Sequence, residues 1–170
     1  EIVFELHTHD VELCVLSEIR CLYRDERRTR RVTLDHVPGA PSYRISFPEA
    51  SEHLGVAIAA RCHADRAPFA IEDVEFRGPR LVTMQLRSKR TSVRVIGSYS
   101  PTSSSHTLEE ADSHLAGIAA LMPRTQETIV LGDLNAHTCY GGTSAYAPHY
   151  DPTTAQGEML SMFCAEHDLK

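Results

Sequence analysis

The segment ETIVLGDLNAH, residues 127–137, decides the fold because it joins a short apolar run to a polar turn. The run at residues 129–131 is too short for a surface helix and predicts a β-strand that is buried on both faces. Gly132, Asp133 and Asn135 are turn formers, so a carboxylate and an amide emerge together where this strand ends. Folds of the α/β class bind ligands at such strand ends. The alternative from these residues alone is a turn that merely closes a strand.

The composition is that of one soluble domain. The chain has 170 residues, of which 42% are hydrophobic and 24% are charged, enough for a substantial core. Disordered and fibrous classes are therefore excluded. No apolar run approaches the roughly 20 residues that span a bilayer, and residues 1–5 lack the basic start of a signal peptide. We predict a single domain over residues 1–170 with no membrane partner, and the abrupt start indicates a fragment.

The cysteines and the net charge restrict the cellular setting and the partners. The five cysteines are odd in number and widely spaced, with no C-x-x-C pair, which predicts a reducing, intracellular compartment. The net charge of -6 argues against a basic protein that coats nucleic acid without specificity. A carboxylate-lined metal site can make a nuclease domain locally acidic, so charge alone leaves nucleic acid open as the partner.

Apolar periodicity predicts the end of a helix at residues 1–9 and strands at 11–17, 43–47 and 55–59. The apolar run at residues 14–16 favours burial of its strand on both faces. Glu18 comes directly after this strand, where a carboxylate is costly unless it is solvated, paired or bound to a cation. Glu18 is therefore a candidate ligand, and a glutamate that points into water is the alternative.

Two further features of this part of the chain are a glycine in a predicted strand and an arginine-rich stretch. Gly55 is expected to let another backbone approach closely. Residues 23–31 contain five arginines beside two acids and predict an exposed loop or the start of a helix. These arginines could contact nucleic-acid phosphates, and an ordinary solvated surface is the alternative.

A hairpin and a crossover are predicted in the second half of the chain. Residues 80–87 and 92–99 alternate between apolar and polar, which predicts an antiparallel hairpin whose first strand has one solvent-facing side. The period of two places Tyr99 on the apolar face of the second strand, where it could simply cap the core. The capping box at residues 107–110 begins an amphipathic helix that leads into the strand of the opening segment, an α-to-β crossover. The remaining elements are a surface loop at residues 139–154 and a last helix at 156–168.

Four short motifs, taken in chain order, resemble those of the endonuclease/exonuclease/phosphatase superfamily. They are a glutamate after a strand at residue 18, Gly-Val-Ala-Ile at 55–58, Tyr-Ser-Pro at 99–101 and Gly-Asp-Leu-Asn-Ala at 132–136. The family writes them Gln-Glu-Thr, Gly-Val-Ala/Gly-Ile, Tyr-x-Pro and Gly-Asp-Phe-Asn-Ala. The chain most closely resembles the endonuclease domains of non-LTR (LINE-type) retrotransposons and the craniofacial development protein 2-like proteins, over nearly its whole length. Ser-Glu-Ile at 17–19 departs from the first motif but keeps its carboxylate.

The resemblance implies a fold and a role for each site residue. The fold would be a four-layer α/β/β/α sandwich, two mixed sheets faced by helices, incomplete at both ends. Glu18 corresponds to the ligand of a divalent cation, Mg²⁺ or Mn²⁺. Asp133 corresponds to the aspartate that orients or deprotonates the attacking water, while Asn135 and Tyr99 correspond to groups that hold the scissile phosphate.

The implied function is metal-dependent phosphodiester hydrolysis, by a DNA-nicking endonuclease domain of a retrotransposon-type protein in the nucleus or cytoplasm. Nucleic acid is the implied partner, DNA in preference to RNA. Two alternatives stay open: a phosphatase or RNA-directed member of the same superfamily, and a non-catalytic relic or interaction domain. The family's late Ser-Asp-His motif does not occur in the chain, because Asp112-Ser113-His114 has another order and lies in the predicted helix. Little nuclease activity is therefore expected of this chain by itself.

Overall fold

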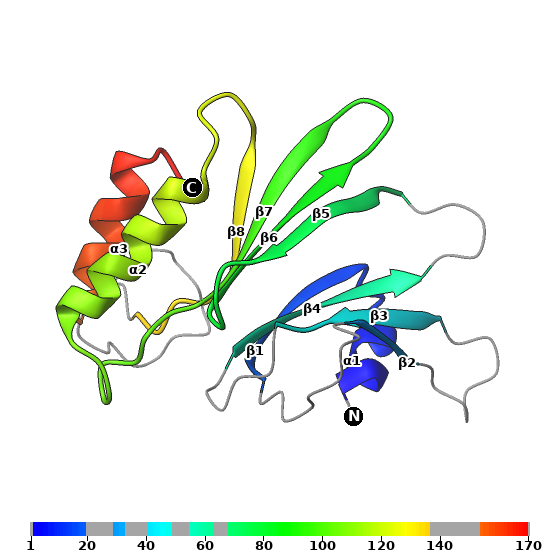
Figure 1. Cartoon of the computed structure of the whole chain (residues 1–170), viewed down its shortest axis with the longest axis horizontal. Coiled ribbons are helices and arrows are strands. Elements are labelled where there is room, and N and C mark those ends of the chain that lie inside the picture. Colours follow the sequence, from blue (N-terminus) through cyan, green and yellow to red (C-terminus); the bar gives the residue numbers. More distant parts are fainter. Residues whose placement is uncertain are drawn as a thin grey trace, which may run out of the picture. The chain divides into compact units, whose positions relative to one another are not determined.

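The computed structural model describes residues 2–19, 29–32, 41–48, 55–62, 68–136 and 154–169, which form three helices and two four-stranded sheets (Figure 1). The chain divides into two compact units. The sheet unit contains Glu1–Tyr99 and Met122–Asp133, and the helical unit contains Ser100–Leu121 and Leu134–Lys170. The elements in chain order are α1 (Ile2–Thr8), β1 (Leu13–Ile19), β2 (Thr29–Val32), β3 (Ser42–Ser46), β4 (Gly55–Cys62), β5 (Ala70–Phe76), β6 (Leu81–Arg87), β7 (Ser92–Tyr99), α2 (Leu108–Leu121), β8 (Thr128–Asp133) and α3 (Ala155–Glu166).

The two sheets differ in strand direction. The first has the order β1-β4-β3-β2 and is antiparallel throughout its described strands, so the prediction of two mixed sheets is wrong for it. The second has the order β5-β6-β7-β8, with antiparallel pairs except for β7 and β8, which are parallel. The parallel pair follows from the connection through α2, because parallel neighbours need a crossover. The predicted hairpin and the predicted crossover are both confirmed.

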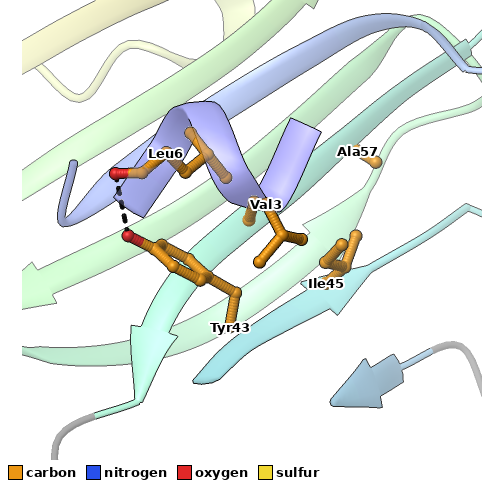
Figure 2. Close-up of a cluster of buried hydrophobic side chains, with 6 residues drawn as sticks. Val3, Leu6, Tyr43, Ile45 and Ala57 are labelled. Carbon is orange, nitrogen blue, oxygen red and sulfur yellow. Dashed lines mark hydrogen bonds between the residues drawn. The ribbon is translucent and has the colours of Figure 1, made fainter. Parts of the chain in front are cut away.

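The core of the sheet unit lies on both faces of β4. Val56 and Ile58 point between the two sheets, where they meet residues of β6 and β7 such as Met84. Ala57 and Ala59 face the other way and pack with residues of α1 and β3 (Figure 2). Alternate side chains of one strand thus enter two different clusters. The sheet unit consequently has three layers: helix, sheet and sheet.

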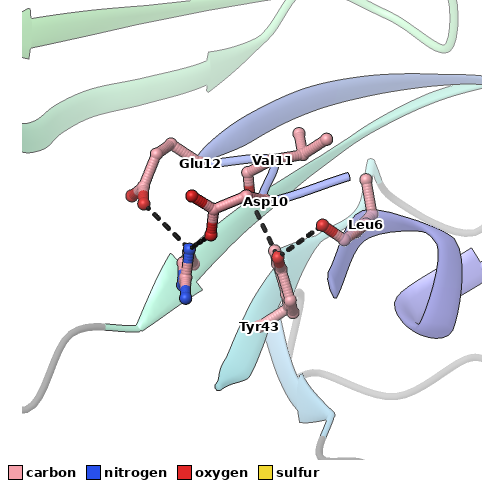
Figure 3. A network of polar contacts seen from close by, with 6 residues as sticks. Leu6, Asp10, Val11, Glu12 and Tyr43 are labelled. Carbon is pink, nitrogen blue, oxygen red and sulfur yellow. Dashed lines mark hydrogen bonds and ion pairs between the residues drawn. The ribbon is translucent and has the colours of Figure 1, made fainter. Parts of the chain in front are cut away.

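A buried tyrosine ties α1 to the first sheet. Tyr43 is fully buried, and its hydroxyl lies 3.0 Å from the carbonyl oxygen of Leu6 and 2.8 Å from that of Val11 (Figure 3). Beside it, the Arg61 guanidinium pairs with the carboxylates of Asp10 and Glu12, just before β1. Burial raises the pKa of Tyr43, so its hydroxyl remains a hydrogen-bond donor. These contacts fix the turn from which β1 runs toward Glu18.

Glycine at position 97 lets the two sheets pack closely. A Cβ atom there would lie 2.6 Å from Cγ1 of Val82 on the neighbouring strand and 3.1 Å from each methyl carbon of Val15 on the other sheet. Both valines are stiff at χ1 and cannot easily rotate away. The missing side chain therefore lets β1 approach β7.

We expect Gly97→Ala to lower the free energy of unfolding by about 1–3 kcal/mol, the usual cost of overpacking a core. Chemical denaturation of both chains measures this difference. Val82→Ala removes the methyl group nearest to the added Cβ atom. The double variant Gly97→Ala/Val82→Ala should therefore lose less free energy of unfolding than the sum of the losses in the two single variants. Strictly additive effects would contradict this account of the packing.

The strand β8 is more exposed than its apolar sequence predicted. Ile129 and Leu131 keep 46% and 37% of their surface accessible, so the prediction of burial on both faces is wrong. The reason is its position, because β8 lies at the edge of the second sheet, and among the described strands β7 is its one neighbour. An apolar stretch of sequence can predict a strand, but it does not show which other elements will pack against that strand.

Other differences concern polar and charged strands. The predicted solvent-facing side of β6 is buried at Thr83 and Gln85, and the side-chain amide of Gln85 pairs with that of Gln126. This pairing makes a polar residue tolerable in the interior. The strand β2 takes up the end of the arginine-rich stretch at 23–31, where a loop or helix start was predicted, and residues 20–28 lie outside the described part. The charged sequence of β5 carried no strand prediction.

Both helices predicted in the helical unit are present, although α3 ends at Glu166 and not at residue 168. At the start of α2 the Thr107 amide donates to the Glu110 carboxylate at 2.7 Å, and the Glu110 amide donates to the Thr107 hydroxyl at 3.2 Å, which confirms the capping box. The helix α3 is capped by Thr154, buries Phe163 and lies beside α2 (Figure 1). Most of the predicted loop at 139–154 lies outside the described residues. None of the three described helices is long and apolar enough to cross a membrane.

Candidate active site at the Glu18 bulge

Glu18 lies at a β-bulge. The pairing of β1 with β4 shifts register between Leu16 and Ile19, and Glu18 between them has a φ of 57°, in the left-handed region. A bulge leaves its extra residue outside the ladder and redirects the side chain, and such backbone geometry is concentrated at functional sites. Glu18 is exposed, and it belongs to β1, which corrects the prediction that it follows the strand. The carboxylate thereby leaves the apolar surroundings of β1.

Tyr99 brings the second sheet to this carboxylate. It ends β7, is only 2% exposed, and donates its hydroxyl proton to Oε1 of Glu18 over 3.2 Å. Burial and the hydrogen bond to Glu18 raise the pKa of Tyr99, so the phenol is neutral near pH 7 and acts as a donor. Its ring lies in the apolar cluster between the sheets, on the face of Val95 as predicted. Tyr99 therefore caps the core with its ring and serves the site with its hydroxyl.

Asp133 joins this group from the neighbouring strand. It is the last residue of β8, is exposed, and is paired in register with Tyr99. The Asp133 charge contributes to the raised pKa of Tyr99, after the larger effects of burial and Glu18. The phenol thus donates a hydrogen bond to Glu18 of the first sheet, while Asp133 of the second sheet is its partner on the neighbouring strand. The chemical roles of Glu18 and Asp133 stay predictions.

Asn135 belongs to the helical unit and makes its own contacts there. Its side-chain amide donates to the backbone oxygen of Ser100 over 2.7 Å, and its φ is 47°. Asparagine tolerates this left-handed conformation better than most residues. The observed bond holds the backbone that follows β7. A contact between Asn135 and a phosphate stays a prediction.

Arg80 is a neighbour of Tyr99 that the motifs did not include. Its guanidinium carbon lies 5.1 Å from the centre of the Tyr99 ring, and Nη1 donates to the Tyr99 backbone oxygen at 3.4 Å. The charge of Arg80 partly offsets the rise in the pKa of Tyr99 caused by burial and by the carboxylates. The signal that could have found it was the hairpin register, because Leu81 pairs with Ser98 and thus places Arg80 across from Tyr99.

The carboxylates at this site suit a hard cation that takes only a few of its ligands from the protein. Among the described residues, no three His, Cys, Asp or Glu side chains gather closely enough to form a metal centre. Magnesium usually keeps several waters and takes only one or two carboxylates from the protein. The exposed carboxylate of Glu18, with Asp133 in the same neighbourhood, fits that chemistry. Glu18 is the carboxylate that could hold such an ion.

The comparisons with known proteins give a fold. No family model and no curated protein matches the chain. A solved structure, the endonuclease domain of TRAS1, a telomere-specific non-LTR retrotransposon, matches 97% of the chain with 16% identity and a TM-score of 0.62. The chain spans 64% of the length of that domain. ANGEL2, a 2',3'-cyclic phosphatase, matches 79% of the chain and 43% of its own length, with 13% identity and a TM-score of 0.46. The chain therefore shares its α/β fold with the TRAS1 endonuclease domain.

Proposed function

We propose that this domain hydrolyses phosphodiester bonds with a divalent cation, and that its substrate is a DNA strand. The observation that carries the proposal is the hydrogen bond from Tyr99 to Glu18 beside Asp133. It combines two exposed carboxylates with a neutral donor, the groups that attack on an anionic phosphate needs. The similarity to a retrotransposon endonuclease domain supports DNA as the substrate.

Each of the three side chains has a distinct task in this reaction. Glu18 would hold the cation, and a bound cation would neutralise a phosphate oxygen. Asp133 would orient the attacking water and accept its proton, which an exposed carboxylate can do. Tyr99 would transfer its hydrogen bond from Glu18 to a phosphate oxygen as negative charge develops there.

Cleavage of supercoiled plasmid tests the proposal. The chain and a version extended through the downstream coding sequence are incubated with Mg²⁺ or Mn²⁺, and EDTA provides the metal-free control. Nicking that requires the cation supports the proposal, and we expect it to be stronger in the extended version. Parallel assays with RNA and with a small phosphate ester distinguish the other superfamily activities. Binding of DNA without any cleavage by either version would favour an interaction domain and overturn the proposal.

We expect Glu18→Gln to weaken divalent binding, because the amide keeps the shape of the side chain and removes the charge. Calorimetric titration of Mn²⁺ should show weak binding to the unchanged chain and a smaller heat for the variant. Glu12→Gln is the matched control, since it makes the same change just before β1, where Glu12 pairs with Arg61. Identical isotherms for all three chains would remove Glu18 from the cation site.

A further inference from the structure

Arg80 holds Tyr99 at both the backbone and the ring. The Tyr99 amide donates to the Arg80 backbone oxygen at 2.9 Å. In return, the Arg80 guanidinium reaches the Tyr99 backbone oxygen at 3.4 Å and lies over the ring, 5.1 Å from its centre. A cation over an aromatic face is attracted to the ring, and the planar guanidinium can stack as well. The ring therefore has apolar neighbours in the core and a positive charge over one face.

The turn that carries Arg80 is anchored to both sheets. The Arg77 amide donates to the Leu81 oxygen at 2.8 Å and closes the turn between β5 and β6. The Pro79 oxygen accepts from the Val56 amide on β4, also at 2.8 Å. A Cβ atom on Gly55 would lie 2.9 Å from the same oxygen, which confirms the close backbone approach predicted for this glycine. Arg80 thus projects from a fixed support, as a precisely placed side chain requires.

We infer that Arg80 is a positioning residue, which holds the Tyr99 phenol so that its hydroxyl points to Glu18. The inference rests on the proposed function, in which this hydroxyl binds the scissile phosphate. The ring axis sets the direction of the hydroxyl, and the guanidinium limits how far the ring can tilt out of the space between the sheets. Arg80 also places a positive charge beside a phenol that has two carboxylates in its neighbourhood. Misplacement of a phosphate donor lowers the rate even when substrate binding is retained.

A double-mutant cycle on plasmid nicking separates an action through Tyr99 from a direct one. We expect Arg80→Met to lower kcat about tenfold with little change in KM, since it preserves the length of the side chain and removes the planar charge. In a Tyr99→Phe background the same substitution should lower kcat less than about twofold, because the positioned hydroxyl is already gone. Arg80→Lys should restore only part of the rate, because lysine lacks the planar fork. Equal losses in both backgrounds would overturn the inference.

Nuclear magnetic resonance of isotope-labelled tyrosine rings tests the same inference without any activity. Tyr99→Phe identifies the Tyr99 signal among those of the six tyrosines. Arg80→Met should shift this signal and speed the motion of the ring, while the other tyrosine signals stay in place and report intact folding. Arg77→Met is the matched control, since Arg77 lies on the same turn as Arg80, is exposed and pairs with Glu75 of β5. An unchanged Tyr99 signal in Arg80→Met would refute the positioning role, whereas absence of nicking in every chain would refute only the proposed function.

Discussion

Gly132→Ala is expected to lower the free energy of unfolding by about 3 kcal/mol or more, the combined cost of backbone strain and overpacking. Gly132 has a φ of 138°, which side chains rarely tolerate. A Cβ atom there would lie 1.9 Å from the backbone oxygen of Ser98 and 2.8 Å from its carbonyl carbon. Ser98 is the partner of Gly132 in the parallel pair of β7 and β8, so neither backbone can move without loss of the pairing that places Asp133.

Chemical denaturation measures this effect, and Gly78→Ala supplies the control. Gly78 also has a positive φ, 79°, but a Cβ atom on it would meet no other atom within 4 Å. Its substitution should therefore cost only the conformational strain, about 1–2 kcal/mol. Hydrogen exchange of the β8 amides should rise in Gly132→Ala and stay unchanged in Gly78→Ala. If the two variants were equally stable, the close contact with Ser98 would not be the cause.

In the extended version of the chain, Asp133→Asn is expected to reduce plasmid nicking about 10³-fold, within the range that a general base contributes. The amide has the size of the carboxylate and fits the same strand end, but it cannot accept a proton from water. The rate should fall through kcat, with KM for the plasmid close to its original value, because DNA binding does not depend on this proton transfer. Single-turnover nicking with saturating cation measures the chemical step directly.

Asp73→Asn provides the matched control for this experiment. Asp73 is an exposed aspartate on β5 of the same sheet, so the substitution makes the same change of charge and volume away from Tyr99. Its nicking rate should equal that of the unchanged chain. Retention of full activity by Asp133→Asn would show that another group prepares the water. A parallel loss in both variants would instead indicate an effect that is not specific to the position of Asp133.

The sequence by itself determined those elements that are specified by residues close together in the chain. The capping box at Thr107 begins α2 because the two residues satisfy each other's amides within one turn. The apolar run of β4 is buried on both faces, and the alternation in the hairpin places Tyr99 between the sheets. The motif resemblance selected Glu18, Tyr99 and Asp133, which the structure brings into one neighbourhood.

Only the tertiary structure decided features that depend on neighbours distant in sequence. Ile129 and Leu131 form an apolar run, yet they are exposed because β8 is an edge strand, and edge position is a property of the whole sheet. The bulge at Glu18 arises where β1 shifts register against β4, which neither strand encodes alone. The hairpin register places Arg80 across from Tyr99, but the position of its guanidinium over the Tyr99 ring is seen only in the folded protein. Local patterns select an element, and pairing between elements determines which of its residues meet.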